Sequence, residues 1–89
     1  MDVDMAKKQK AIYDRAKTVS GSNQFNEKDF RKMCEVLESG EAIAIYIDCI
    51  GHTRHHIESS HYANELKKVY GDKLIVDDSH YTIYCELKK

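Results

Sequence analysis

Four of the chain's five histidines, with one cysteine and one arginine, fall within the fourteen residues from Asp48 to His61, which read DCIGHTRHHIESSH. Imidazole, thiol and guanidinium groups in such a short stretch suggest three kinds of chemistry: a metal site, a catalytic site, or a basic loop that holds an anion. Each of these requires a different spacing and different neighbouring residues.

A metal site would need histidines that converge on one point. His52 and His56 are four residues apart, the spacing that places two imidazoles on one face of a helix in H-E-x-x-H enzymes. The residue after His52 is Thr53, so the general-base glutamate of those enzymes is missing. On a helix at about 100° per residue, three of the histidines point in three directions. These are His55, His56 and His61. His80 could join them only through the tertiary fold, so we predict no specific metal site and no cofactor.

No catalytic arrangement in the chain is complete. The stretch HYT, His80 to Thr82, resembles one H-x-[ST] element of the two-histidine phosphoesterases, which need two such elements. His52 is followed by Thr53 and Arg54, so the second element is absent. Neither a Ser-His-Asp nor a Cys-His arrangement stands out, and no glycine-rich phosphate loop is present. We therefore expect no catalytic residue and no enzymatic activity.

An anion site is the strongest chemical alternative for the histidine stretch. Gly51 frees the backbone after a strand, and Thr53 can cap a helix that follows it. Arg54 and the adjacent histidines then lie where unpaired N–H groups and the helix dipole favour negative charge. His55 is the exception, because it falls on the buried face of that helix. The resulting alternative function is a nucleic-acid or phosphate-binding module that uses Gly51, His52, Thr53, Arg54 and His56.

The composition fits one small domain over residues 1–89, with residues 1–5 expected to fray. The 89 residues carry 14 basic and 15 acidic side chains, a formal net charge of −1, which argues against a broadly basic nucleic-acid binder and against an acidic DNA mimic. No apolar run approaches the roughly 20 residues that span a bilayer, and no signal peptide follows Met1. We expect a cytoplasmic protein without a membrane partner, and its Lys- and Ile-rich usage without proline is common in phages.

The three cysteines are predicted to be packing residues. An odd number of cysteines at scattered spacing indicates reduced thiols and not a disulfide framework. All three lie on apolar stripes of predicted elements, which favours burial over a redox or sulfur-carrier role. They are Cys34, Cys49 and Cys85.

The hydrophobic periodicity predicts six elements in the order α-α-β-α-β-β. The helices are Ala6 to Val19, a second from the N-cap Asn26 to Ser39, with Phe25 against Phe30 at its start, and a third from about Ser59 to Tyr70. The strands are Glu41 to Ile50, Leu74 to Val76 and Tyr81 to Leu87, the last two forming a hairpin. The expected fold is two-layer α+β, a three-stranded mixed sheet with helices mainly on one face.

The side chains on the outer face of that sheet and on the third helix predict a binding surface. Tyr46, Thr82 and Tyr84 alternate away from the core residues of their strands. Ile57 lies opposite the core stripe of the third helix, beside His61, and an apolar residue there suits an interface. The predicted partner-binding residues are therefore Tyr46, Ile57, His61 and Tyr84.

The order of elements from Glu41 to Lys89 is similar to the C-terminal half of Alba-type nucleic-acid-binding proteins and of TusA-like sulfur carriers. The Cys-Pro motif of the TusA-like proteins is missing, since the chain has no proline. Arg54 is the only arginine near the corresponding loop, so the basic stretch of an Alba-type protein is thin. The resemblance implies a fold and leaves the function to the residues.

Together these patterns favour a small non-enzymatic binding protein that regulates or inhibits another protein by direct contact. Nucleic-acid or phosphate binding at Gly51 to His56 is the alternative, and metal binding or sulfur transfer comes after both. A chain of this size gains buried surface by pairing with a second copy, so a homodimer is compatible with the sequence.

Overall fold

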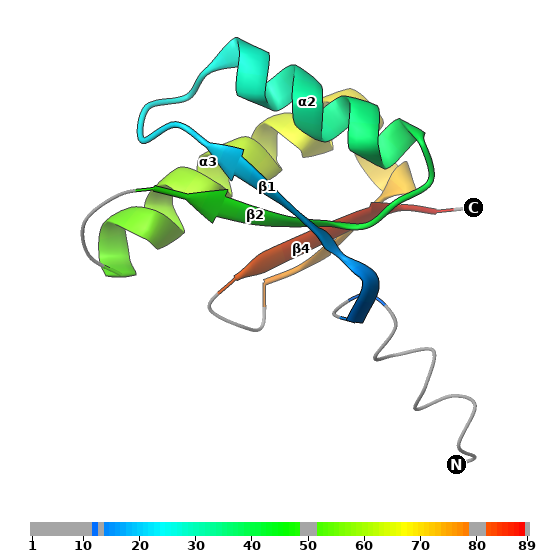
Figure 1. Ribbon diagram of the computed structural model, residues 1–89. Coiled ribbons are helices and arrows are strands. Elements are labelled where there is room, and N and C mark those ends of the chain that lie inside the picture. Colours follow the sequence, from blue (N-terminus) through cyan, green and yellow to red (C-terminus); the bar gives the residue numbers. More distant parts are fainter. Residues whose placement is uncertain (1–11, 13, 49–51, 79–81, 89) are drawn as a thin grey trace.

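The computed structural model describes residues 12, 14–48, 52–78 and 82–88, and at 52–54 it describes the backbone alone. Two helices lie on one face of a four-stranded mixed sheet (Figure 1). The elements are β1 (Lys17–Gly21), α2 (Glu27–Glu38), β2 (Ile43–Ile47), α3 (His52–Tyr70), a 3-10 turn (Gly71–Lys73), β3 (Leu74–Asp77) and β4 (Ile83–Leu87). The α+β class, the mixed sheet and the helices on one face are confirmed. The predicted count of three strands and the order α-α-β-α-β-β are wrong.

The error lies in the first predicted helix, because Lys17–Gly21 is strand β1 and not a helix end. β1 runs parallel to β2, with Val19 opposite Ile45. Residues 12, 14 and 15 are helical, and the rest of the predicted range up to residue 11 lies outside the described residues. Val19 is the only large apolar side chain of β1, so the backbone pairing with β2 determines this strand more than its own sequence pattern does.

Gly21 at the end of β1 has a steric role. A Cβ atom at this position would lie 2.9 Å from Ile47 Cδ1 and 2.9 Å from Tyr62 Cε2. Glycine therefore allows the ring of Tyr62, which comes from α3, to pack directly on the backbone of β1.

The prediction of the second helix is confirmed at both ends. The Asn26 side chain accepts hydrogen bonds from the N–H groups of Lys28 (2.9 Å) and Asp29 (3.1 Å), which is the expected N-cap. The rings of Phe25 and Phe30 lie 5.4 Å apart across this helix start. After Ser39, Gly40 has a φ of 94°, a left-handed conformation that suits the residue following a helix.

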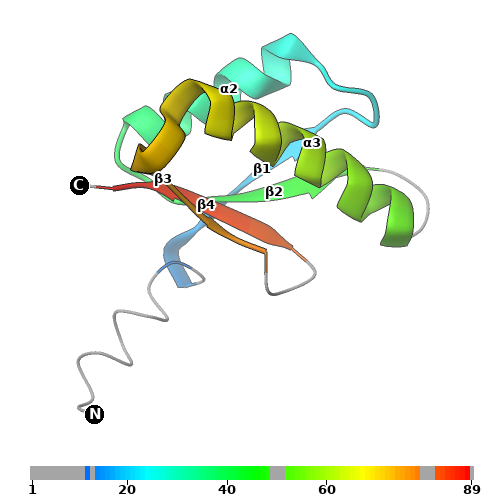
Figure 2. The ribbon, with the colours of Figure 1, turned by 180° about the vertical axis from the view of Figure 1, so that it is seen from behind.

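The sheet order is β1-β2-β4-β3 (Figures 1 and 2). β4 is antiparallel to both of its neighbours, so the predicted C-terminal hairpin is confirmed. It follows that β2 and β3 run in the same direction, as expected for strands joined by a helical crossover, but β4 lies between them. The predicted hairpin turn falls partly on residues 79–81, which lie outside the described residues.

Helix α3 begins at His52, seven residues before the predicted start at Ser59. Its first two turns bury polar side chains and lack the apolar periodicity that identifies a helix. Ser59 is fully buried, and its hydroxyl donates to the backbone carbonyls of His55 (2.8 Å) and His56 (3.2 Å) within the helix. Thr53 therefore lies inside the helix and does not cap it from outside.

The core lies between the sheet and the two helices. The predicted inward face of β2 is confirmed, because Ile43, Ile45 and Ile47 are all buried. From the helices the core receives Met33, Leu37, Tyr62, Ala63 and Leu66, and from the other strands Val19, Leu74, Ile83 and Cys85. Cys49 lies outside the described residues.

Candidate protein-binding surface

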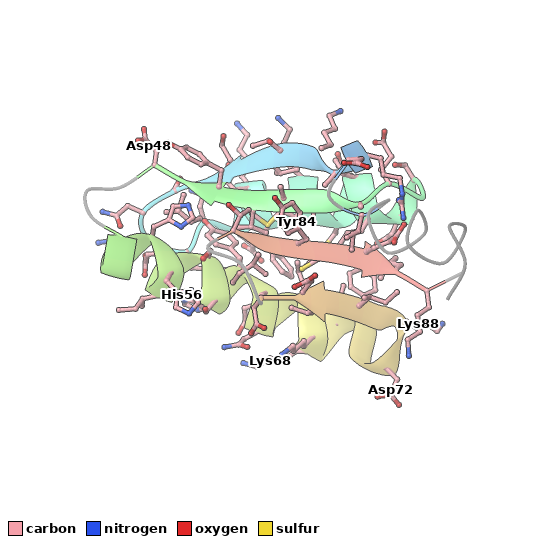
Figure 3. The ribbon with its side chains drawn as sticks, turned by 90° about the horizontal axis from the view of Figure 1, so that it is seen from below. Asp48, His56, Lys68, Asp72, Tyr84 and Lys88 are labelled. Atoms are coloured by element: carbon pink, nitrogen blue, oxygen red, sulfur yellow. The ribbon has the colours of Figure 1, made fainter. Side chains whose placement is uncertain are left out.

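The sheet has a second face that neither helix covers, and we call it the outer face. Alternate residues of each strand point to it, since side chains in a strand alternate between faces. It comprises Thr18 and Ser20 of β1, Ala44 and Tyr46 of β2, Ile75 and Asp77 of β3, and Tyr84 and Glu86 of β4. Figure 3 looks onto this face, with Tyr84 near its centre.

Large side chains on the outer face are exposed to solvent. Tyr46 is 50% exposed and Ile75 is 39% exposed, while Tyr84 is half-buried. Tyr84 lies opposite Ala44, so Tyr46 and Tyr84 are diagonal neighbours on adjacent strands. Aromatic side chains at this separation can contact one ligand together.

An ion pair covers another part of the outer face. Arg15, just before β1, donates from Nη2 to Glu86 Oε1 at 2.8 Å, and its Nη1 lies 2.5 Å from Glu86 Oε2. The hydrogen bond to Glu86 raises the pKa of the Arg15 guanidinium. Glu86 is buried, and so is Ala44 on the neighbouring strand. The ion pair neutralises the charge of Glu86. Tyr46 is exposed on the same face and Tyr84 is half-buried there.

His55 fixes the end of the outer face where Tyr46 lies. Its Nε2 accepts a hydrogen bond from the backbone N–H of Ile47 at 3.3 Å, so this nitrogen carries no proton. The His55 ring meets the ring of Tyr46 edge-on at 5.7 Å between centroids. The prediction that His55 is a buried, hydrogen-bonded histidine is confirmed.

The structure divides the four predicted partner-binding residues between two surfaces. Tyr46 and Tyr84 share the outer face. Ile57 and His61 lie on α3, in the layer on the other side of the sheet. Ile57 is 55% exposed, a point that its helical position left open between a staple at the helix start and a surface residue. The ring of His61 stacks on Phe25 at 4.9 Å, so this histidine covers the loop before α2.

Most of the alternative anion site falls on residues or side chains outside those that the structure describes. Gly51 lies outside the described residues, and the side chains of His52, Thr53 and Arg54 are not described. His56 is exposed on α3. Binding of an anion at these five residues stays a prediction from the sequence.

Metal and thiol chemistry find little support in the described part of the chain. No three histidine, cysteine, aspartate or glutamate side chains come together there in a way that could hold a metal ion. Cys85 is fully buried, and burial raises the pKa of its thiol to about 12. Cys34 is half-buried on α2.

Several residues of the candidate surface were not predicted from the sequence. Arg15 and Glu86 are 71 positions apart in the chain, and no local pattern joins them. Ile75 could have been identified, because its alternation with Leu74 and Val76 puts it on the opposite face. Val69, in the last turn of α3, is 58% exposed.

Comparisons with known proteins give no information about this surface. No protein-family model matches the chain, and no curated protein is similar to it in sequence. Among the described residues, no helix combines the length and the apolar character that crossing a bilayer requires.

Proposed function

We propose that this protein is a non-enzymatic binding protein that regulates or inhibits another protein through the outer face of its sheet. The observation that carries the proposal is the position of Tyr46. This large aromatic side chain is half-exposed in the middle strand pair of a sheet whose other face is fully packed. Exposed apolar and aromatic side chains that share one face of a protein often mark a binding site when they form a contiguous patch, and Tyr46 and Tyr84 are neighbours on this face.

The chemistry of the outer face suits a protein partner. Tyrosine is enriched at the centre of protein interfaces, where its ring is buried and its hydroxyl still finds a hydrogen bond. Tyr46 and Ile75 supply exposed apolar area, and Thr18 and Ser20 supply small polar groups beside it. The strands beneath are held by the packed residues Ile43 and Ile45, so the surface loses little conformational entropy on binding.

The test is to compare how variants capture a partner from lysate of the native host. We expect Tyr46→Ala to remove the captured protein, because a buried aromatic anchor typically contributes about 2 kcal/mol or more to binding. Val69→Ala is the matched control, since Val69 is equally exposed but lies on α3. Ile57→Asp separates the two predicted surfaces, and we expect it to leave capture intact.

The free energy of unfolding of each variant shows whether a loss of capture reflects lost binding or an unfolded protein. Each exposed substitution should change the free energy of unfolding by no more than about 0.5 kcal/mol. If Tyr46→Ala captures the same protein as the wild type while Ile57→Asp loses it, the binding surface lies on α3 and the outer face must be abandoned.

A further inference from the structure

The free edge of β1 offers unpaired backbone groups. Lys17 donates its N–H to the carbonyl of Ala42 at 2.9 Å, so Lys17, Val19 and Gly21 direct their backbone groups toward β2. In a strand the residues between these direct theirs to the opposite side. The N–H and C=O groups of Thr18 and Ser20 therefore point away from the sheet, and within the described residues they have no partner. Both residues are exposed.

The free edge has a defined end. The next residue, Ser22, is already occupied: Asp29 Oδ2 accepts from its backbone N–H at 3.0 Å and from its hydroxyl at 2.7 Å. The carbonyl of Ser22 accepts from the Tyr62 hydroxyl at 3.3 Å. The edge thus presents two donors and two acceptors, enough for a short added strand and for little more.

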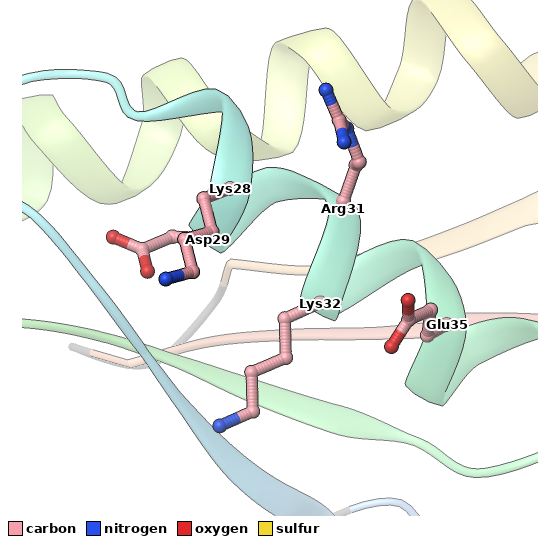
Figure 4. Close-up of a pocket in the computed structure, with 5 residues that line it drawn as sticks. All are labelled: Lys28, Asp29, Arg31, Lys32 and Glu35. Atoms are coloured by element: carbon pink, nitrogen blue, oxygen red, sulfur yellow. The ribbon is translucent and has the colours of Figure 1, made fainter.

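Three lysines surround this edge. Lys17 begins β1, and Lys28 and Lys32 belong to α2, whose start is tied to the end of β1 through Asp29. Figure 4 shows Lys32 extending from α2 toward β1, while Arg31 points away from it toward α3. The two α2 lysines also line a hollow of about 420 Å³ on this helix, together with Arg31 and the acidic residues Asp29 and Glu35. The carboxylate of Asp29 is already bonded to Ser22. Within the described residues none of the three lysines forms an ion pair.

The opposite edge of the sheet has mixed charge, because Lys73 and Lys88 lie at one end of it and acidic residues lie at the other. β3 ends at Asp77, and Asp78 follows it. The N–H of Leu74 is bonded to the carbonyl of Gly71, so that edge offers fewer free donors. The two edges therefore differ, because one outward-facing donor of β3 is already bonded whereas both outward-facing donors of β1 are unpaired within the described residues.

We propose that the free edge of β1 binds an extended, acidic segment of another protein as a fifth strand of the sheet. The inference deepens the proposed function, on which it rests, by naming the kind of partner and the way it docks. Residues of the added strand that face Thr18 and Ser20 would point to the outer face, and the residues between them would point toward α2. Acidic side chains at those positions would meet Lys28 and Lys32.

The positive charge beside the β1 edge favours an acidic strand over a second copy of the chain as the segment that binds there. Two β1 edges paired about a twofold axis would bring Lys17, Lys28 and Lys32 close to the same lysines of the other copy, and like charges across an interface oppose association. Lysines at a free edge also discourage such self-pairing, so the same residues that exclude a second copy favour an acidic strand.

The probe is a blocked heptapeptide of alternating threonine and glutamate, titrated into the whole protein and followed by NMR. We expect the amide signals of Thr18 and Ser20 to shift and to become protected from hydrogen exchange. The same peptide N-methylated at every residue lacks the N–H groups that would pair with the edge in either strand direction, and we expect it not to bind. A peptide that alternates threonine and lysine should not bind either.

Two variants test the edge and the charges separately. Ser20→Pro removes an edge donor without touching the bonds to β2, because proline is tolerated at a free strand edge, and we expect it to abolish binding. Lys28→Glu combined with Lys32→Glu should lower the affinity by about tenfold or more. The matched control, Lys73→Glu with Lys88→Glu, makes the same change in net charge at the other edge and should stay within about twofold of the wild type.

The outcomes distinguish this inference from the proposed function. Equal binding of the N-methylated peptide, or unchanged exchange at Thr18 and Ser20, would overturn the added strand, as would concentration-dependent self-association that competes with the peptide. Stronger binding of an oligonucleotide than of the acidic peptide to the same lysines would overturn it as well. If the peptide fails while Tyr46→Ala still abolishes partner capture, the inference is wrong and the outer-face proposal stands.

Discussion

The hydroxyl of Tyr62 joins the residue that follows β1 to the N-cap of α2. It accepts from the backbone N–H of Asn26 at 3.0 Å and lies 3.3 Å from the carbonyl of Ser22, to which it donates. These two residues begin and end the loop between β1 and α2. One buried side chain thus holds both the end of the free edge and the N-cap of α2.

Tyr62→Phe should lower the free energy of unfolding by about 1–2 kcal/mol, because the N–H of Asn26 and the carbonyl of Ser22 lose their partner while the ring stays in place. Urea unfolding followed by circular dichroism measures the difference. Tyr46→Phe is the control, since its side chain is half-exposed. Equal losses in the two variants would show that the Tyr62 hydroxyl bonds contribute nothing specific.

Cys85 should resist thiol reagents until the protein unfolds. Burial raises the pKa of its thiol to about 12, and the thiolate is the reactive form. We expect alkylation of Cys85 at pH 8 to be slow in the native protein and fast in urea, as read by mass spectrometry of the modified peptide. Rapid native labelling of Cys85 would revive a functional thiol.

At the scale of elements, two tyrosine hydroxyls of α3 form hydrogen bonds near the two ends of α2. Tyr62 reaches the loop before α2, and the Tyr70 hydroxyl donates to Glu38 Oε2 at 2.6 Å at its C-terminal end. Burial raises the pKa of Tyr62, and burial followed by the hydrogen bond to Glu38 raises that of Tyr70. The bond from Tyr70 to Glu38 and the bond from Tyr62 to the carbonyl of Ser22 require the neutral phenol, because the hydroxyl donates in both.

This arrangement predicts a loss of stability at alkaline pH. Each tyrosine keeps its proton in the folded state to a higher pH than in the unfolded state, whose tyrosines lose theirs near pH 10. The contribution of these two tyrosines to the free energy of unfolding should therefore be fully present below that pH and fall as the pH rises toward the folded-state values. Urea unfolding between about pH 9 and pH 11 measures the fall. Tyr70→Phe should flatten the curve, and an unchanged slope would remove Tyr70 from the explanation.

The elements also show which features a sequence can reveal. α2 was predicted from its cap, its staple and its apolar stripe, because all three signals are local. β2 and the hairpin followed from alternation of large apolar residues. β1 was missed because KTVSG contains one large apolar residue and gains its partner from residues more than twenty positions away. The early start of α3 was missed because its buried side chains there are His55 and Ser59, whose burial depends on hydrogen bonds that no periodicity shows.

At the scale of the whole molecule, the charge distribution separates the two classes of function. The formal net charge is −1 with neutral histidines, so long-range attraction to nucleic acid is weak and any phosphate binding must come from a local group. The histidine stretch from Asp48 to His61, which contains Arg54, is such a group. The outer face has its central charges paired and depends on tyrosine and isoleucine.

We therefore expect the complex with the captured protein to survive nuclease treatment and a rise in salt from about 0.15 M to about 0.5 M, because contacts of apolar and aromatic groups are not screened. Salt should remove only the part of the affinity that Lys28 and Lys32 contribute. Phosphate recognition behaves in the opposite way, since each neutralised phosphate makes affinity fall further with salt.

A labelled oligonucleotide titrated at about pH 6 and pH 7.5 gives the comparison. Arg54→Ala is the informative variant, because arginine stays charged at both pH values and can hold phosphate with two N–H groups. Binding of the oligonucleotide that strengthens at the lower pH, weakens with salt and is lost in Arg54→Ala would transfer the function from the outer face to the histidine stretch. Capture that persists in high salt, with no oligonucleotide binding at either pH, would leave His52, Arg54 and His56 as part of a helix start with a structural role only.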